Sequence, residues 1–129
     1  MTKRLDEAGG LTVADVTHTR ITAFPASATV AELREWFESS TSHRMALLAD
    51  DGRYAGSLMA ADVTGADDAA LAVEFAAHGQ TVRPDEPASR AEELALGTAD
   101  TRRVPVVDAD GRLHGIVAIT TDLQGFCGT

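Results

Sequence analysis

Two carboxylates, Asp62 and Asp122, each end a stretch in which residues of the same kinds follow in the same order. Both stretches, 42–62 and 101–122, run from a basic residue through an apolar segment to Asp-Gly-Arg, then through a second glycine and a second apolar segment to the aspartate. A carboxylate accepts strong, charge-assisted hydrogen bonds, and an arginine before the apolar segment offers a planar guanidinium that suits an anion. These residue types therefore predict the binding of a polar ligand.

The two stretches belong to a longer internal repeat. The turn glycines Gly52 and Gly111 are 59 residues apart, and the same offset relates six further pairs: Thr22 and Thr81, Pro25 and Pro84, Arg44 and Arg103, Asp51 and Asp110, Arg53 and Arg112, and Gly56 and Gly115. A repeat of this length indicates one supersecondary unit used twice. We therefore expect the function where the two copies meet.

Catalytic and metal-binding motifs are not recognisable in the sequence. The four histidines, at positions 18, 43, 78 and 114, form no His-x-x-x-His pattern, and the single cysteine, Cys127, excludes an internal disulfide and a Cys-x-x-Cys site. The chain also lacks a glycine-rich phosphate loop and a nucleophile motif. We therefore predict a protein that is not an enzyme and holds no metal, and we interpret Cys127 as an inert thiol.

Composition narrows the class of partner. The chain has 129 residues and a net charge of −9, which disfavours nucleic acid and anionic membranes because affinity for a polyanion comes largely from neutralising its phosphates. No run of eighteen apolar residues is present, and no apolar segment of a secretory signal follows the basic residues near the N-terminus. A single thiol suits a reducing compartment, so we predict a cytoplasmic protein.

Periodicity predicts the order strand, helix, strand, strand, helix in each half. A capping box, Thr29-x-x-Glu32, should start the first helix, and Ser89 should cap its counterpart. The expected strands are 19–24, 45–48, 54–59, 81–82, 104–107 and 113–119, and an alanine-rich helix is expected over 67–77. Pro105 cannot donate a ladder hydrogen bond, which favours an edge position or a strand start. We divide the chain into a loose N-terminal arm (1–10), a first repeat (11–66) and a second repeat (67–129).

The residues from Arg103 to Val117, RVPVVDADGRLHGIV, resemble the core of the CBS domain, named for cystathionine β-synthase. The whole chain, over roughly residues 11–124, resembles a tandem pair of such domains, a Bateman module. The resemblance implies an α/β (α+β) fold of two β-α-β-β-α repeats packed about a pseudo-two-fold axis. It also implies clefts between the repeats that hold adenosine compounds, and pairing of two such chains into a homodimer.

In the second copy, the resemblance assigns the ribose of the ligand to Asp122, with Thr121 or Thr120 supplying a hydroxyl. Asp122 lies seven residues after the second glycine instead of six, so one extra residue must be absorbed, for example as a bulge. Arg102 and Arg103 resemble positions near the base or the phosphate, and Thr81 is a further candidate at the end of the first strand. We favour this copy as the working site.

In the first copy, the corresponding candidates are Asp62, His43, Arg44 and Thr22. This copy departs further from the family pattern, because Met59 stands where a hydroxyl is expected and alanines replace a proline and an aspartate at positions 46 and 49. Asp62 and Asp122 could also simply cap the helices that follow them, since aspartate is a favoured N-cap residue.

Two functions of different classes follow. The first is a stand-alone sensor that binds AMP, ADP, ATP or S-adenosylmethionine and signals to an effector protein in trans. The second is a protein-interaction or dimerisation module whose cleft has lost its ligand.

Overall fold

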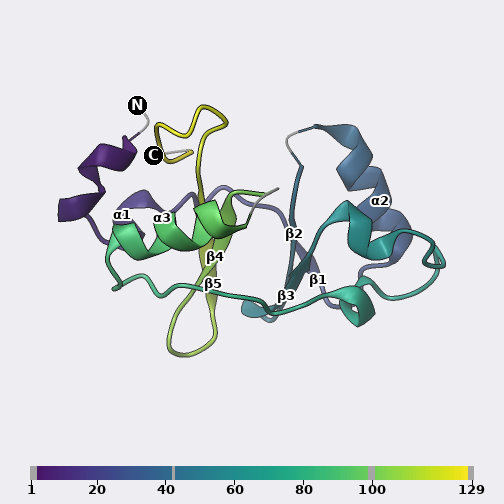
Figure 1. Ribbon diagram of the computed structural model, residues 1–129. Coiled ribbons are helices and arrows are strands. Elements are labelled where there is room, and N and C mark those ends of the chain that lie inside the picture. Colours follow the sequence, from purple (N-terminus) through teal and green to yellow (C-terminus); the bar gives the residue numbers. More distant parts are fainter. Residues whose placement is uncertain (1–2, 42, 99–100, 128–129) are drawn as a thin grey trace. The chain divides into compact units, whose positions relative to one another are not determined.

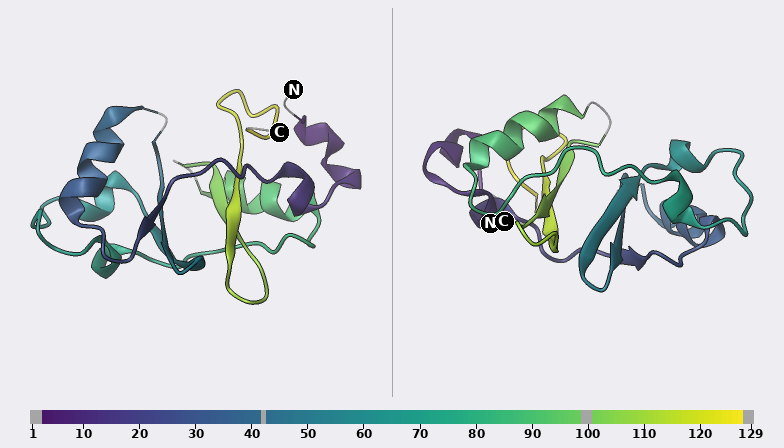
Figure 2. Two further views of the ribbon diagram at one scale, coloured as in Figure 1. Left: turned by 180° about the vertical axis from the view of Figure 1, so that it is seen from behind. Right: turned by 90° about the horizontal axis from the view of Figure 1, so that it is seen from below.

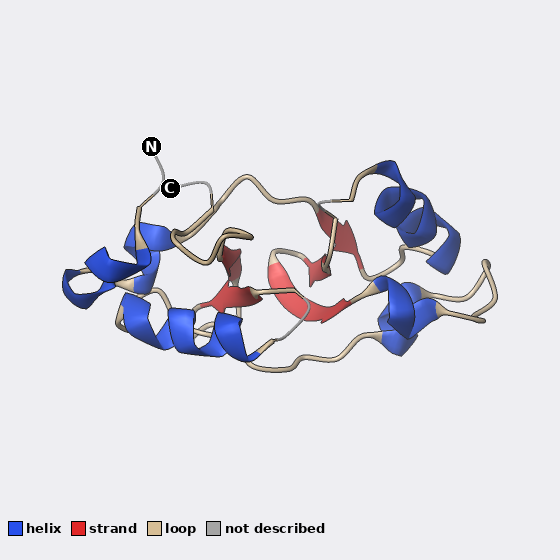
Figure 3. Ribbon diagram, turned by 45° about the horizontal axis from the view of Figure 1, so that its top comes forward, coloured by secondary structure: helices blue, strands red, loops and turns tan. Residues whose placement is uncertain are grey.

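The computed structural model describes residues 3–41, 43–98 and 101–127, which divide into two compact units (Figure 1). Unit 2 comprises residues 22–79, and unit 1 combines residues up to 21 with those from 80 onward. Each unit buries an apolar cluster of its own, rich in valine, leucine and alanine. Within each unit the helices lie to one side of the strands (Figure 3). The fold is mixed α/β with small sheets, as the sequence predicts.

Unit 2 contains a three-stranded sheet of order β1-β2-β3, in which β1 and β2 are parallel and β2 and β3 antiparallel. Its elements are β1 (Ala23–Pro25), α2 (Val30–Ser39), β2 (Ala46–Asp50), β3 (Arg53–Leu58) and the short 3-10 helices η2 (Ala60–Val63) and η3 (Ala72–Phe75). Helix α2 begins where predicted, because the Thr29 hydroxyl accepts a hydrogen bond from the Glu32 amide. It buries Val30 and Leu33 completely against the sheet.

Unit 1 pairs β4 and β5 as an antiparallel hairpin beside helix α3. Its elements are η1 (Leu5–Gly10), α1 (Val13–Val16), α3 (Ala88–Gly97), β4 (Arg103–Val107) and β5 (Leu113–Ala118). The prediction that Ser89 caps helix α3 is wrong, because the helix begins at Ala88 with Pro87 at the N-cap; Ala91 and Ala95 are buried in the core. Pro105 lies inside β4, where its carbonyl accepts from the Val82 amide and Val107 donates back to Val82.

The repeat predicted from the 59-residue offset is present in the hairpins. Each has one register shift, between Leu48 and Ala49 in unit 2 and between Val106 and Val107 in unit 1. The second glycine lies just after each bulge because another segment approaches its backbone there. A Cβ on Gly115 would lie 2.3 Å from the His18 carbonyl oxygen, and one on Gly56 would lie 3.0 Å from the Cβ of Ala76.

The boundaries of the compact units differ from the predicted 66/67 division. Residues 11–21 pack on unit 1, where Val13 and Ala14 donate to the carbonyls of Glu86 and Pro84 and residue 18 pairs with β5. Residues 67–79 pack on unit 2, where residue 77 pairs with β3. Residues 11–21 thus precede the first strand of the first copy but pack at the sheet of unit 1. Residues 67–79 precede the first strand of the second copy but pack at the sheet of unit 2.

The prediction of a loose arm over residues 1–10 is wrong for the residues that the structure describes there. Residues 5–10 form η1, Ala8 is buried, and the Leu5 amide donates to the Gln124 carbonyl. The Phe126 amide donates in turn to the Lys3 carbonyl. Backbone pairing with the last described segment orders the arm.

The alanine-rich helix predicted over 67–77 is also wrong, because only η3 forms within it. Instead, the Ala70 carbonyl accepts from the Val30 amide, the Ala72 amide donates to the Ala28 carbonyl, and Ala77 and Ser57 bond reciprocally. Pairing with other segments thus overrides the helix propensity of alanine. The predicted helix after Asp122 is likewise replaced by turns in the described residues. No helix in the described ranges has both the length and the apolar character needed to cross a bilayer.

Candidate ligand site

Asp122 lies in a compact loop formed by residues 120–125 at the end of β5. Its Oδ1 accepts a hydrogen bond of 2.6 Å from the Thr120 hydroxyl and one of 3.1 Å from the Gln124 amide. The Thr120 hydroxyl in turn accepts from the Gly125 amide, and the backbones of Thr120 and Gly125 bond as well. Asp122 therefore closes a local turn instead of capping a helix, and Thr120 is the hydroxyl partner that the sequence proposed alongside Thr121.

This geometry keeps the Asp122 carboxylate charged and available. The Thr120 hydroxyl, and then the Gln124 amide, hold the pKa of Asp122 below its usual value because both donate to the ionised form. The bonds from Thr120 and Gln124 both reach Oδ1. The side chain is exposed, so Oδ2 can accept hydrogen bonds from a ligand.

Arg102 lies beside this loop. Its carbonyl accepts from the Ile119 amide, and its Nε donates to the Ile119 carbonyl over 3.4 Å. The backbone of Arg102 has a positive φ of 52°, which turns the chain into β4 directly after it. Arg103 starts β4 opposite Ala118, and its Nη1 donates to the Thr101 carbonyl. The structure thus brings both arginines to the sheet end that carries Thr120.

Two other candidates of the second copy lie apart from the carboxylate interaction. Thr121 is exposed and adjacent to Asp122 in the chain, but Thr120 provides the hydroxyl bond to Asp122. Thr81 is exposed and precedes Val82, whose parallel pairing with Val106 places Thr81 beside Pro105. It is therefore one strand away from the β5 end that carries the loop.

A pocket of about 230 Å³ opens beside the loop and contains side chains that the sequence did not indicate. It is lined by Thr120, Asp122, Gln124 and Gly125, together with Arg4 from the N-terminal segment. Residue 4 pairs with residue 125 as an antiparallel bridge, which brings Arg4 to the pocket. No local pattern could have found Arg4, since its partner lies about 120 residues further along the chain.

In unit 2 the corresponding aspartate is bound to its own backbone. Asp62 lies in η2, and its Oδ2 accepts a hydrogen bond of 2.7 Å from the Met59 amide. This differs from the N-cap role that the sequence left open, because Asp62 is the third residue of η2 and its carboxylate reaches back to the residue before that helix. Met59 supplies no hydroxyl, so the arrangement around Asp122 has no equivalent here.

His43 is similarly engaged in packing. Its ring stacks on Trp36 with centroids 4.0 Å apart and an interplanar angle of 4°, and its Nδ1 lies 2.6 Å from the Trp36 carbonyl oxygen. The histidine therefore covers the end of α2. Arg44 is exposed just before β2, and Thr22 is exposed just before β1, where the register places it beside Ala46. Among the described residues, the bond given to the Asp62 carboxylate comes from the Met59 amide of its own segment.

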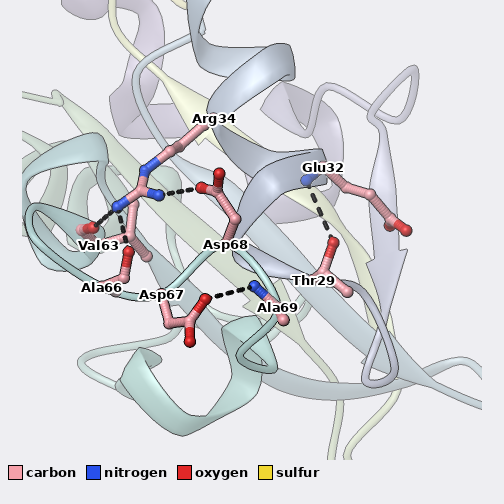
Figure 4. A network of polar contacts seen from close by, with 8 residues as sticks. All are labelled: Thr29, Glu32, Arg34, Val63, Ala66, Asp67, Asp68 and Ala69. Carbon is pink, nitrogen blue, oxygen red and sulfur yellow. Dashed lines mark hydrogen bonds and ion pairs between the residues drawn. The ribbon is translucent and has the colours of Figure 1, made fainter.

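Arg34, which the sequence did not single out, anchors the segment after Asp62 to helix α2 (Figure 4). Its Nη2 donates to the carbonyls of Val63 and Ala66, at 2.6 and 2.7 Å, and its Nη1 forms an ion pair with Asp68. The same guanidinium lines a pocket of about 330 Å³ between α2 and residues 60–65. Its donors are used to hold the fold, so Arg34 is a structural cation.

Metal chemistry has no support in the described ranges, where no three His, Cys, Asp or Glu side chains gather in a way that could hold an ion. Cys127 is half-buried, and its amide donates to the Ala118 carbonyl beside the loop.

Comparison with known proteins identifies the fold. Residues 80–121 match the family profile of the CBS domain. No curated protein matches the sequence. Among solved structures, the cystathionine beta-synthase pair domain of SO5017 from Shewanella oneidensis MR-1 superposes with a TM-score of 0.75 at 17% identity, covering 88% of this chain and 68% of that one.

Two further structures were solved with nucleotides. CBSX2 from Arabidopsis thaliana, in complex with AMP, has a TM-score of 0.72 at 25% identity, with 84% of this chain and 90% of that chain covered. The cytosolic domain of the Mg²⁺ channel MgtE, in complex with ATP, has a TM-score of 0.70 at 24% identity. The match covers 84% of this chain and 46% of that chain.

Proposed function

We propose that this chain is a regulatory module that binds an adenosine nucleotide at the Asp122 loop. Two findings support the proposal: residues 80–121 match the profile of the CBS domain, and the chain has the fold of a CBS-domain pair. AMP in CBSX2 and ATP in the MgtE domain support this class of ligand. AMP, ADP, ATP and S-adenosylmethionine are the candidates, because all contain the ribose that an aspartate can recognise.

The Asp122 carboxylate is the observation that carries the proposal. It is ionised, exposed and oriented through Oδ1 by Thr120 and Gln124, which leaves Oδ2 for a ligand. A carboxylate can accept hydrogen bonds from both hydroxyls of a ribose, and such charge-assisted bonds are stronger than neutral ones. Because the loop holds the side chain in place before binding, little rotamer entropy is lost when the ligand arrives.

The two copies differ in a way that favours a single nucleotide site, in unit 1. In unit 2 the carboxylate of Asp62 is bonded to the Met59 amide and the ring of His43 is stacked on Trp36. Met59 gives Asp62 no hydroxyl partner comparable to Thr120, and the His43 ring is already used in packing, so the Asp122 loop is the better prepared of the two sites.

Regulation is the role that fits a binding module. A ligand that binds one conformation better than another shifts the population that an effector protein encounters. We place that effector in trans, assign the module no catalytic step, and propose that it acts as a homodimer in the cytoplasm.

A second candidate function is that of an interaction module without a ligand. The internal bonding of Asp62 and His43 favours it, since these residues of unit 2 serve the fold. A thermal-shift panel with AMP, ADP, ATP, S-adenosylmethionine and NAD at millimolar concentration separates the two candidates. A ligand that binds only the native state at 100 times its Kd adds about 2.7 kcal/mol of stability, which raises Tm by several degrees. A rise with an adenosine nucleotide supports the sensor, and no rise with any of the five ligands supports the interaction module.

A further inference from the structure

The N-terminal segment forms a strand-like pairing with the end of the Asp122 loop. The Leu5 amide donates to the Gln124 carbonyl over 2.9 Å, and the Phe126 amide donates to the Lys3 carbonyl over 2.8 Å. The purple N-terminal segment and the yellow loop after β5 belong to the same compact unit (Figure 2). Phe126 is completely buried and Ala8 nearly so, both in the core of unit 1, so apolar packing stabilises this pairing.

This pairing delivers a cation to the pocket that contains Asp122. Residue 4 bridges residue 125, and the Arg4 side chain lines the pocket with Thr120, Asp122 and Gln124. The guanidinium is exposed, and its contact among the described residues is through Nε to Asp6 at 3.3 Å, which leaves both terminal nitrogens to other partners. In a chain of net charge −9, an anionic ligand needs such a local cation beside the carboxylate.

We propose that Arg4 binds the phosphate of the ligand whose ribose Asp122 holds, so that the N-terminal segment makes the site selective for nucleotides over nucleosides. This inference rests on the function proposed above. The pocket of about 230 Å³ supports it, because Arg4 and Asp122 both line it and one ligand can therefore reach both side chains. A planar guanidinium also matches phosphate oxygens bidentately.

Phosphate binding should also strengthen the pairing of the two segments, because the ligand would connect Arg4 on one to Asp122 on the other. The amides of Leu5 and Phe126 make the cross-segment bonds, so they report the effect directly. AMP should slow their hydrogen exchange several-fold more than adenosine does, since adenosine offers Arg4 no phosphate.

Isothermal titration with AMP and adenosine tests the inference on wild type, Arg4→Gln and the control Arg20→Gln, which removes the same charge from another exposed arginine of unit 1. Arg4→Gln should weaken AMP binding about tenfold to a hundredfold, the range expected for losing hydrogen bonds to a charged group, and should change adenosine binding less than about twofold. Arg20→Gln should leave both affinities within about twofold. A thermal melt of each variant confirms that it is folded.

The outcomes separate the two proposals. Wild type that binds AMP, with Arg4→Gln binding it equally well, overturns the role of Arg4 and leaves the proposed function standing. Equal losses of affinity for AMP and adenosine in Arg4→Gln also overturn it, because removing a phosphate contact cannot weaken the binding of a nucleoside, which has no phosphate. Wild type that binds neither AMP nor adenosine, together with no rise in Tm across the five-ligand panel, overturns the proposed function and this inference together.

Discussion

Replacing Gly115 by alanine tests whether the pairing of residues 17–18 with β5 requires a glycine at position 115. The backbones of His18 and Ile116 exchange two hydrogen bonds, of 2.8 and 3.1 Å, directly beside this glycine. A Cβ on residue 115 would lie 2.3 Å from the His18 carbonyl oxygen and 2.9 Å from Cγ2 of Thr17, distances that force the two segments apart. Gly115→Ala should therefore break the pairing.

The expected loss follows from these contacts. Two backbone hydrogen bonds contribute about 0.5–1.5 kcal/mol each, and the overpacking adds about 1–3 kcal/mol, so the free energy of unfolding should fall by about 2–6 kcal/mol. Gly9→Ala is the matched control, because a Cβ there meets no atom within 4 Å, and its effect should stay within about 0.5 kcal/mol.

The assay must report on unit 1. The only tryptophan and the only tyrosine, Trp36 and Tyr54, both lie in unit 2, so fluorescence is unsuitable. Urea unfolding followed by far-UV circular dichroism gives the free energy, and hydrogen exchange of the Ile116 amide reports the broken pairing. Equal stability of Gly115→Ala and Gly9→Ala, with the Ile116 amide still protected, would refute the reasoning.

Two further predictions concern other parts of the fold. Arg34→Met should lower the free energy of unfolding of unit 2 by about 1–3 kcal/mol, because it leaves the Val63 carbonyl without its charged donor. Trp36 fluorescence during urea unfolding measures this loss. The control Arg53→Met, in the exposed hairpin, should lower the free energy of unfolding far less. The hydrogen bond with His114, and then those with backbone amides, hold the pKa of Asp108 below its usual value. The Asp108 carboxylate therefore contributes to the free energy of unfolding in full above about pH 4, and this contribution is lost as pH falls through the lower pKa of the folded state. Asp108→Asn should therefore show a shallower fall of Tm below pH 4 than wild type, and an unchanged slope would contradict this.

Local patterns were sufficient for much of the fold. The Asp-Gly turns, the capping box at Thr29 and the strands of the two hairpins depend on neighbours in sequence, and they formed close to where they were predicted. The first strand of each copy did not, since β1 covers Ala23–Pro25 instead of 19–24 and residue 82 forms an isolated bridge. The offset of 59 also predicted that Gly56 and Gly115 share a role, which the structure explains by the close approach of another segment to each.

The errors arose where distant pairing decides the backbone. Residues 67–77 have the alanine content of a helix, yet Ala72 bonds to Ala28 and Ala77 to Ser57, interactions that periodicity within the segment cannot reveal. The same holds for the N-terminal segment, whose polar and glycine-rich sequence suggests a loose arm while its backbone pairs with residues 124–126.

The candidate site was predicted in part for the same reason. Asp122, Thr120 and Arg102 lie within or beside one hairpin, so the repeat pattern was enough to group them. Arg4 enters the pocket only through long-range pairing and carried no sequence signal. The difference between Asp122 and Asp62 was indicated by Met59, but the bond from the Met59 amide needed the structure.

Titration of AMP and 2′-deoxy-AMP into wild type, Asp122→Asn and Asp62→Asn tests the central claim most directly, because it asks whether the Asp122 carboxylate recognises a ribose. Wild type and Asp62→Asn should prefer AMP by about tenfold or more, and Asp122→Asn should bind both ligands weakly with no preference. Retention of the preference in Asp122→Asn, or its loss in Asp62→Asn alone, would contradict the account.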